Sequence, residues 1–379
     1  MLTESQIERY GYGNERIFYD LENQLMEDIV RRIKKTGEIT ITADYQIMQL
    51  KALGLSNDEI TERIKNALNA SDEYVKQLYD KVIQQEWADA KDLYLGMNHP
   101  YVQYADNAFI QNLVNGAFMQ TSGEMVNMTG SLGFVVGGKS VELSKFYTDT
   151  MDNAISLIMG GGFDYNTVLK KAIKQMTNSG IRWINYESGW HNRITVASRR
   201  SVMTGLSQMT RGITEDTAKR LNADTFEVSA HAGARPDHAK WQGKVYTKKQ
   251  LYEICGLGTV NGLLGANCYH TYYPFIKGIS KRAYTDEQLN AWRNDTHKMY
   301  NGKEYTQYQA QQRMRQMETN MRAQRQTINL LKLGGADKKT ITEERIKYRI
   351  QMQQYKDIAK FFGLKEQKER IYIDGLGRV

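Results

Sequence analysis

The sequence contains few of the residues that cross-link or interrupt a chain. It has two cysteines and three prolines in 379 residues. Cys255 and Cys268 alone do not make a disulfide framework, so we expect free thiols and synthesis in a reducing compartment, the cytosol. No run of 18 apolar residues occurs, and the first residues lack a basic stretch followed by an apolar core. We therefore predict neither a membrane-spanning helix nor a secretory signal.

Helical spacing of apolar residues is the dominant pattern in the sequence. Ile17, Leu21, Leu25 and Ile29 recur at every fourth position and would line one face of an amphipathic helix. Similar spacing covers most of the chain, and the scarcity of proline allows such helices to continue. We therefore predict an extended, mainly α protein with a small β-containing region, which places it in the α+β class.

Interruptions of this pattern divide the sequence into four predicted modules. They are an N-terminal helical module at residues 1–94, a middle helical module with glycine-rich turns at 95–222, a β-containing region at 223–278, and a basic helical arm at 279–379. We call residues 223–278 the knot. The knot contains three of the six histidines and both cysteines, so chemistry that needs fixed geometry is expected there.

Positive charge is concentrated in the C-terminal quarter. Residues 281–379 hold 21 Lys and Arg against 12 Asp and Glu, whereas the preceding 280 residues hold 30 against 31. A basic helical segment is often a solvated face, but a positive field also suits an acidic protein surface or a nucleic-acid backbone contacted through its phosphates. The charge leaves these three interpretations open.

One glycine-rich segment matches a nucleotide-binding pattern. Residues 133–140 read GFVVGGKS, as in the phosphate-binding loop G-x-x-x-x-G-K-[ST]. That loop needs a buried strand before it and a helix after it. The preceding MVNMTGSL is too polar for a central strand, and no later series of alternating strands and helices supplies a parallel sheet. A glycine-rich turn or short hairpin is therefore the favoured interpretation.

Cap residues and heptads predict where several helices begin and how two of them pair. Ser71 is predicted to start a helix, and Thr340 with Glu343 is predicted to form a capping box. Gly334 and Gly335 separate two segments with heptad spacing, which predicts an αα-hairpin whose apolar seam is covered by its own other half or by another subunit. The heptad positions are Met314, Met317, Met321, Ile328, Leu331, Tyr348, Met352, Tyr355, Ala359 and Phe362. The tail at 371–379 is predicted to be a short strand or a docking segment.

The knot holds a candidate metal site. His231, His238, Cys268 and His270 offer three imidazoles and a thiol, which are ligands that tetrahedral zinc accepts. Further candidates for a fourth ligand are Cys255, Asp237 and Glu227. Glycines between these residues would allow the chain to wrap around an ion, although the spacing matches no zinc finger or ribbon. A structural zinc ion is thus one hypothesis. In the alternative, the histidines bond to main-chain carbonyls and the cysteines pack as small core residues.

Two catalytic interpretations use the same residues. A His-rich loop with Asn267 next to Cys268 is similar to metal-dependent nucleases, which suggests a DNA-processing or toxin-like enzyme, but no general base can be identified beside an ion. Cys268 and His238 could also pair as a thiol nucleophile and its base, yet no orienting residue or oxyanion loop can be named. Neither interpretation has a complete set of catalytic groups.

The runs SAHAGARPDHAKWQGKVYT and GLLGANCYHTYYPFIKG carry a resemblance to a known family. Together they resemble the minor capsid protein 2 family of tailed phages of Gram-positive hosts, which is related to Mu-type head morphogenesis proteins. Besides the four candidate ligands, the family motif is matched at Gly233, Ala234, Arg235, Pro236, Trp241, Gln242, Gly243, Lys244, Gly265, Asn267 and Pro274. This chain departs from the family's usual residues at Tyr269 and near Trp292, which puts direct phosphate contacts at those two places in doubt.

The resemblance implies a structural component of the virion and not an enzyme. Such a protein would act with the portal in procapsid assembly, DNA packaging or DNA delivery, in the capsid interior or at the portal vertex. Its expected partners are the portal protein, the major capsid or scaffolding proteins, and other copies of itself on an oligomeric ring, with packaged double-stranded DNA as a further partner. A DNA-binding protein unconnected with virions is the remaining alternative, and no membrane contact is expected.

Overall fold

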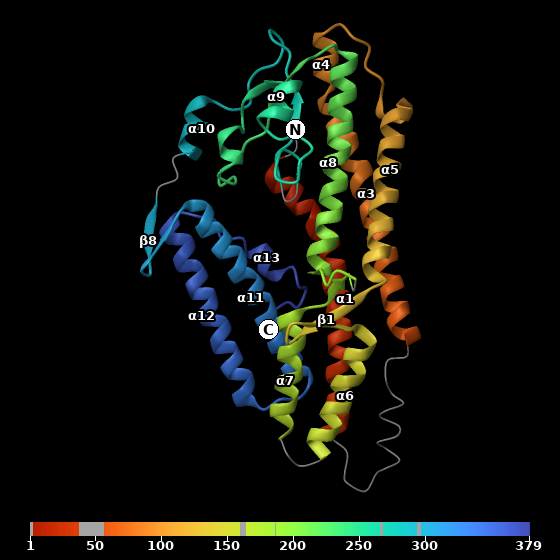
Figure 1. The fold of residues 1–379 in the computed structure, drawn as a ribbon, viewed down its shortest axis with the longest axis vertical. Coiled ribbons are helices and arrows are strands. Elements are labelled where there is room, and N and C mark those ends of the chain that lie inside the picture. The colour runs from red at the N-terminus through yellow and green to blue at the C-terminus, as the bar shows by residue number, and fades with distance from the viewer. Residues whose placement is uncertain (1–2, 38–56, 160–163, 186, 266–267, 294–296) are drawn as a thin grey trace. The chain divides into compact units, whose positions relative to one another are not determined.

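The computed structural model describes residues 3–37, 57–159, 164–185, 187–265, 268–293 and 297–379. The chain is 66% helical and contains a few small antiparallel sheets (Figure 1). This confirms the predicted mainly α class with a small β-containing region. None of the helices in these residues is both long enough and apolar enough to span a bilayer.

The chain forms two compact units, each assembled from three segments of sequence. The first unit contains Met1–Gly13, Asp72–Gly123 and Arg199–Gln312, and the second contains Asn14–Ser71, Glu124–Ser198 and Arg313–Val379. Several helices contribute residues to both units: α1 (Glu4–Gly37), α3 (Asn57–Asp89), α5 (Ala108–Thr129), α8 (Ile194–Arg220) and α11 (Gln307–Leu333).

Within the first unit, the parts of α3, α5 and α8 that belong to it pack closely through a buried tyrosine. The hydroxyl of Tyr79 lies 2.9 Å from Oγ1 of Thr121 and donates to the main-chain carbonyl of Val202 at 3.0 Å. Gly205 makes this approach possible, because a Cβ atom there would lie 2.0 Å from the same hydroxyl. The remaining elements of this unit outside the knot are α4 (Lys91–Gly96), η1 (Tyr104–Asp106), α10 (Asp286–Arg293), β8 (Lys298–Tyr300) and β9 (Lys303–Tyr305).

The second unit combines a small sheet with helices. Its strands are β1 (Leu132–Val136), β2 (Lys139–Glu142), β3 (Arg182–Ile184) and β4 (His191–Arg193), in the order β2-β1-β3-β4 with antiparallel neighbours. Its further helices are α6 (Leu143–Met159), α7 (Tyr165–Ser179), α12 (Lys338–Phe362) and α13 (Lys368–Tyr372).

The GFVVGGKS segment is a β-hairpin, as the favoured interpretation predicts. Strands β1 and β2 pair across Gly137 and Gly138, whose φ angles are +56° and +77°. Two successive positive φ values are typical of the tight turns that join antiparallel strands, and glycine adopts them without strain. Lys139 is exposed and lies on β2. The segment therefore does not have the strand-loop-helix arrangement of a phosphate-binding loop.

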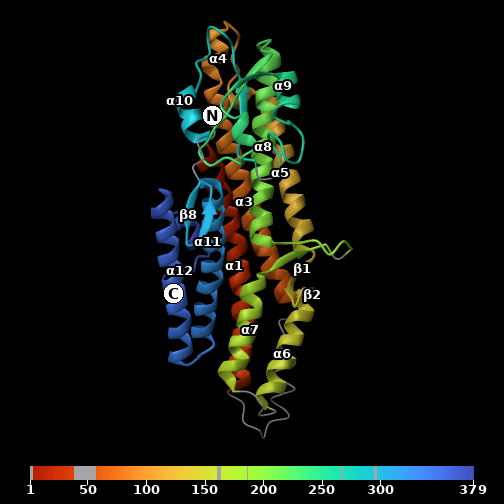
Figure 2. The same ribbon diagram turned by 60° about the vertical axis from the view of Figure 1, so that its left-hand side comes forward.

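The C-terminal residues form the predicted αα-hairpin, with α11 and α12 side by side in both views (Figure 1 and Figure 2). The seam is covered within the chain, since Met321, Ile328 and Leu331 are fully buried. The predicted capping box is wrong: Asp337 is the N-cap of α12, and its side chain accepts a hydrogen bond from the main-chain N–H of Thr340. A carboxylate directly before the first turn is a strong cap and leaves Thr340 inside the helix.

Ser71 does not begin a helix, which corrects the second predicted start. It lies inside α3, where its side chain is buried and its hydroxyl donates to Oδ1 of Asn14 at 2.7 Å. A serine hydroxyl engaged in this way is not available to cap a helix. Helix α3 therefore continues through Ser71 as a single helix from Asn57 to Asp89.

The tail docks onto α11 and is not a strand. Asp374 is fully buried and forms a two-point ion pair with Arg325, at 2.7 and 3.1 Å. The same guanidinium donates to the main-chain carbonyl of Gly377 at 2.7 Å. Of the two predictions for residues 371–379, the docking segment is the one that the structure confirms.

Candidate functional site

The knot is built on a three-stranded antiparallel sheet of the first unit. Strand β5 (Thr225–Val228) lies between β6 (Val245–Thr247) and β7 (Tyr272–Pro274). Between the strands run the short helices η2 (His238–Lys240) and α9 (Lys248–Glu253). Helix α9 begins with a capping box between Thr247 and Gln250, which fixes the chain direction after β6.

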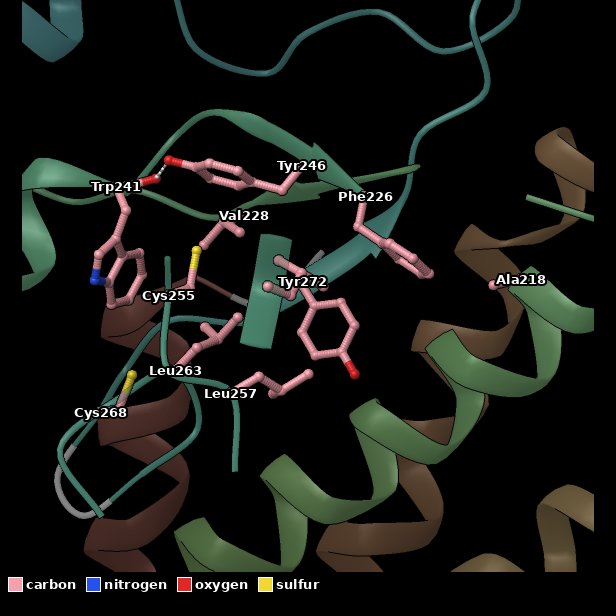
Figure 3. Packing of buried hydrophobic residues seen from close by; sticks show 11 residues of the cluster. Ala218, Phe226, Val228, Trp241, Tyr246, Cys255, Leu257, Leu263, Cys268 and Tyr272 are labelled. Carbon is pink, nitrogen blue, oxygen red and sulfur yellow. Dashed lines mark hydrogen bonds between the residues drawn. The ribbon is translucent and has the colours of Figure 1, made fainter. Parts of the chain in front are cut away.

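A small apolar core holds the knot together (Figure 3). Phe226 and Tyr272 meet edge to face from neighbouring strands, and the hydroxyl of Tyr246 donates to the main-chain carbonyl of Trp241 at 3.0 Å. Cys255 lies within this core, and burial raises the pKa of its thiol to about 12. It therefore packs as a small apolar residue. Cys268 lies at the edge of the same core in Figure 3.

Three of the four predicted ligands converge at that edge. The Nδ1 atoms of His238 and His270 are 3.3 Å apart, and the Sγ atom of Cys268 lies 3.8 Å from the first and 3.6 Å from the second. The two histidines are each 2% exposed and the cysteine is 8% exposed. They come from η2 and from the segment that leads into β7, so the fold brings together residues 30 positions apart.

The outer partners of the two imidazoles bear on where their ring hydrogens lie. The main-chain N–H of His231 donates to Oε1 of Gln242 at 3.0 Å, which identifies this atom as the amide oxygen. Nε2 of His270 lies 2.9 Å from the same oxygen and so carries a hydrogen. Nε2 of His238 lies 2.9 Å from the main-chain carbonyl of Asn261, which can only accept, and it also contacts the Arg235 guanidinium, which can only donate. In the tautomer in which His238 donates to Asn261, each Nδ1 presents a lone pair to the cluster.

Burial sets the protonation of the three groups. It lowers the pKa of His238 and lowers that of His270 well below its ordinary value, where the neighbouring His231 and His238 add to the effect. Both imidazoles are neutral at pH 7. Burial also raises the pKa of the Cys268 thiol. Burial outweighs the charge of Arg235, so this cysteine is a shielded thiol, which is not the state of an activated nucleophile.

The other candidate ligands lie outside this group of converging atoms. The ring of His231 stacks at 4.5 Å from that of His270, and its Nδ1 lies 3.2 Å from the main-chain carbonyl of Ala232. Asp237 is largely exposed and caps η2. Glu227 accepts a hydrogen bond from the main-chain N–H of Ala283 at 2.9 Å. Among the residues described, the cluster consists of His238, Cys268 and His270.

The remaining motif residues support the cluster from outside. Trp241 is buried, with ring centroids 4.5 Å from His238 and 4.9 Å from His270. Gly233 and Gly243 have φ angles of +73° and +67°, and a Cβ atom at either position would collide with a neighbouring side chain. The motif thus specifies the walls of the site as well as its donor atoms.

Two further motif residues lie at the edge of the site, and Asn267 lies outside the described part of the chain. The Arg235 guanidinium donates to the carbonyl of Asn261 at 2.5 Å and contacts the His238 ring. Pro236 is exposed. Asn261 itself is a partner that sequence reasoning missed, since a main-chain carbonyl leaves no signature in residue type.

A pocket of about 440 Å³ adjoins Cys268. Its walls include Arg200 and Arg211 of α8 together with Gly258, Thr259 and Gly265 of the knot. The sequence gives no sign that Arg200 and Arg211 line one wall. Three helical turns separate Arg200 from Arg211, so the two side chains share one face of α8.

The comparisons with known proteins find the same family that the histidine- and cysteine-containing motif of the knot indicates. The family model described as phage minor capsid protein 2 matches residues 2–360, which is nearly the whole chain. No curated protein and no solved structure matches it. A match of this extent includes the helical parts as well as the knot, and the chain therefore belongs to the phage minor capsid protein 2 family.

Proposed function

We propose that the protein acts with the portal during assembly of the phage head, in procapsid formation, DNA packaging or DNA delivery. The family match over residues 2–360 carries this proposal, because the family is one of phage structural proteins. Made in the host cytoplasm, the protein would reside in the capsid interior or at the portal vertex. Its partners would be the portal protein, major capsid or scaffolding proteins, and other copies of itself on the ring.

A basic hollow in the second unit supports contact with packaged double-stranded DNA. The hollow has a volume of about 850 Å³, and five arginines line it: Arg16, Arg325, Arg345, Arg349 and Arg378. The charge of Arg325 is neutralised by Asp374. Arg345, Arg349 and Arg378 are exposed, and no described carboxylate forms an ion pair with them. Arginines in this state are suited to bind phosphates without reading sequence.

The association with the portal can be tested by purification from infected cells. Portal rings isolated from procapsids and from finished particles should carry this protein in a fixed ratio to the portal subunit. Recovery only as a free chain, with none in either kind of particle, would contradict the proposal.

The DNA contact has a separate test in its salt dependence. Replacing Arg345, Arg349 and Arg378 by Ala should weaken binding to duplex DNA of any sequence. The slope of log K against log salt should also fall by about 2 to 3, close to 0.9 for each lost phosphate contact. A control that replaces the exposed Lys65, Lys81 and Lys139 removes the same charge elsewhere. Equal loss in both variants would show a general charge effect and contradict a specific surface.

An enzymatic role makes a different prediction. A metal-dependent nuclease or toxin-like enzyme built on the knot would cleave DNA with turnover, and Cys268→Ser would abolish the cleavage. We expect no turnover, because the donor atoms of the knot are buried. Turnover that survives purification and is lost in Cys268→Ser would replace the structural proposal by an enzymatic one.

A further inference from the structure

The three donor atoms of the knot have the spacing of ligands around one tetrahedral ion. Zinc lies about 2.05 Å from imidazole nitrogen and about 2.3 Å from thiolate sulfur. Tetrahedral angles then place two such nitrogens about 3.3 Å apart and a nitrogen and a sulfur about 3.6 Å apart. The observed separations are 3.3 Å between the two Nδ1 atoms, and 3.6 and 3.8 Å from them to sulfur.

When His238 donates from Nε2 to the Asn261 carbonyl, hydrogen bonding within the cluster does not account for this spacing. With hydrogens on both Nε2 atoms, the Nδ1 atoms of His238 and His270 are both acceptors and face each other at 3.3 Å. The thiol of Cys268 supplies one hydrogen, which can satisfy only one of them. A buried acceptor left without a donor costs about 1–3 kcal/mol. A cation at the centre of the three atoms satisfies every lone pair at once.

We propose that His238, Cys268 and His270 bind one zinc ion through Nδ1, Sγ and Nδ1, with a water or another ligand completing the tetrahedron. Imidazole and thiolate donors favour zinc over magnesium or calcium, which prefer oxygen. On binding, the Cys268 thiol releases its proton to solvent and the sulfur forms the bond to zinc as a thiolate.

The surroundings of the cluster match those of a bound imidazole. Metal-ligating histidines usually donate their second ring N–H to a carboxylate, a carbonyl or a water, which fixes the tautomer. Gln242 and the carbonyl of Asn261 do this for His270 and His238. Trp241 packs against both rings. The ion would join η2 to the segment that enters β7 and so fasten these two parts of the knot to each other.

The first test measures metal in the full-length protein without an affinity tag, since polyhistidine itself binds metal. Protein made in zinc-supplemented medium and purified without chelators should contain about one zinc per chain. Cys268→Ser should lower this content about tenfold or more. The matched control is Cys255→Ser, which removes the other buried thiol and should retain full zinc content. Equal zinc content in wild type and Cys268→Ser would overturn the proposal.

A second test does not depend on a variant that folds. Wild-type protein stripped of metal and titrated with Co²⁺ should give the strong visible bands of a tetrahedral ion and a thiolate-to-metal charge-transfer band, saturating at about one equivalent. Zinc added afterwards should displace the Co²⁺ and abolish these absorption bands. A weak octahedral spectrum, or no binding by folded protein with unchanged helical circular dichroism, would rule out the site.

Discussion

The C-terminal hairpin and the knot both bury polar side chains, but they balance them in different ways. Around α11 and α12, buried charges face opposite charges within the chain, as Arg325 faces Asp374 and Glu344 faces Lys174. In the knot, His238, Cys268 and His270 gather neutral donor atoms. The buried charges of the hairpin are therefore paired within the chain, whereas the neutral donor atoms of the knot are, in our proposal, the ligands of a cation.

This difference shows where each region obtains its stability. Breaking a buried ion pair leaves an unpaired charge in the interior, so the hairpin should respond strongly to single substitutions and to pH. The stability of the knot should instead depend on bound metal. The four predictions below test this contrast, in order of decreasing expected effect.

The largest effect is expected at the buried ion pair. Arg325→Met leaves Asp374 buried without its partner and should lower the free energy of unfolding by about 3–5 kcal/mol, measured by urea denaturation. The exposed Arg345→Met serves as the control and should change it by less than about 0.5 kcal/mol. Adding Asp374→Leu to Arg325→Met should recover part of the loss. A loss below about 1 kcal/mol in the single variant would show that the pair does not hold the tail.

Glu344 gives the hairpin a pH dependence. Although burial raises it, hydrogen bonds from Gln324, Lys174 and Lys347 lower the pKa of Glu344 to about 2. The contribution of Glu344 to the free energy of unfolding, about 3 kcal/mol, is therefore fully present above about pH 4.5 and is lost as the pH falls toward 2. Glu344→Gln should be less stable than wild type at pH 7, and the difference should vanish near pH 2.

The neighbouring carboxylate provides the control for this pH effect. Glu343 is about half exposed and lies 3.6 Å from Lys170. Glu343→Gln should change stability by less than about 0.5 kcal/mol at any pH. If Glu344→Gln stays less stable than wild type by the same amount from pH 7 to pH 2, the charge of Glu344 is not the cause.

In the knot, Gln242 is expected to affect stability through its effect on zinc binding. Gln242→Leu removes the acceptor that orients His270 and should weaken zinc binding about 10–100-fold, measured by competition with a coloured chelator. Its thermal stability should fall below that of wild type in zinc and should match that of wild type more closely after chelation. A variant that binds zinc as tightly as wild type would show that the amide does not hold the ligand in place.

The smallest effect is expected at the cap of α12. Asp337→Ala removes the acceptor for the N–H of Thr340, which lies 2.8 Å away, and should cost about 1 kcal/mol in a thermal or urea melt. Glu343→Ala, which would remove the partner of a box starting at Thr340, should be close to neutral. A larger loss in Glu343→Ala than in Asp337→Ala would restore the capping box that the sequence suggests.

Much of the fold follows from local patterns. Two adjacent glycines predict the turn at Gly137 and Gly138, and heptad spacing with a Gly-Gly break predicts the α11 and α12 hairpin. Caps are harder to read, because several polar residues near a helix start compete for the same N–H groups. Asp337 and Thr340 differ by three positions, and only the backbone path decides which of them caps the helix.

The sequence predicts which residues supply donor atoms to the candidate site, but it does not predict the groups that surround them. The motif singles out His238, Cys268 and His270 by residue type, and it includes His231, whose donor atoms lie outside the group. Which three of the four meet depends on backbone turns that residue types do not encode. The same holds for the two compact units, since helices such as α8 contribute to both and local periodicity carries no sign of the division.

The most direct test of the metal-fastened knot is anomalous scattering from a crystal of the full-length protein at the zinc absorption edge. The account predicts a single strong peak in the knot, about 2.0 Å from Nδ1 of His238 and of His270 and about 2.3 Å from Sγ of Cys268. The three side chains in the same positions with no anomalous peak between them, in crystals grown with zinc, would contradict it.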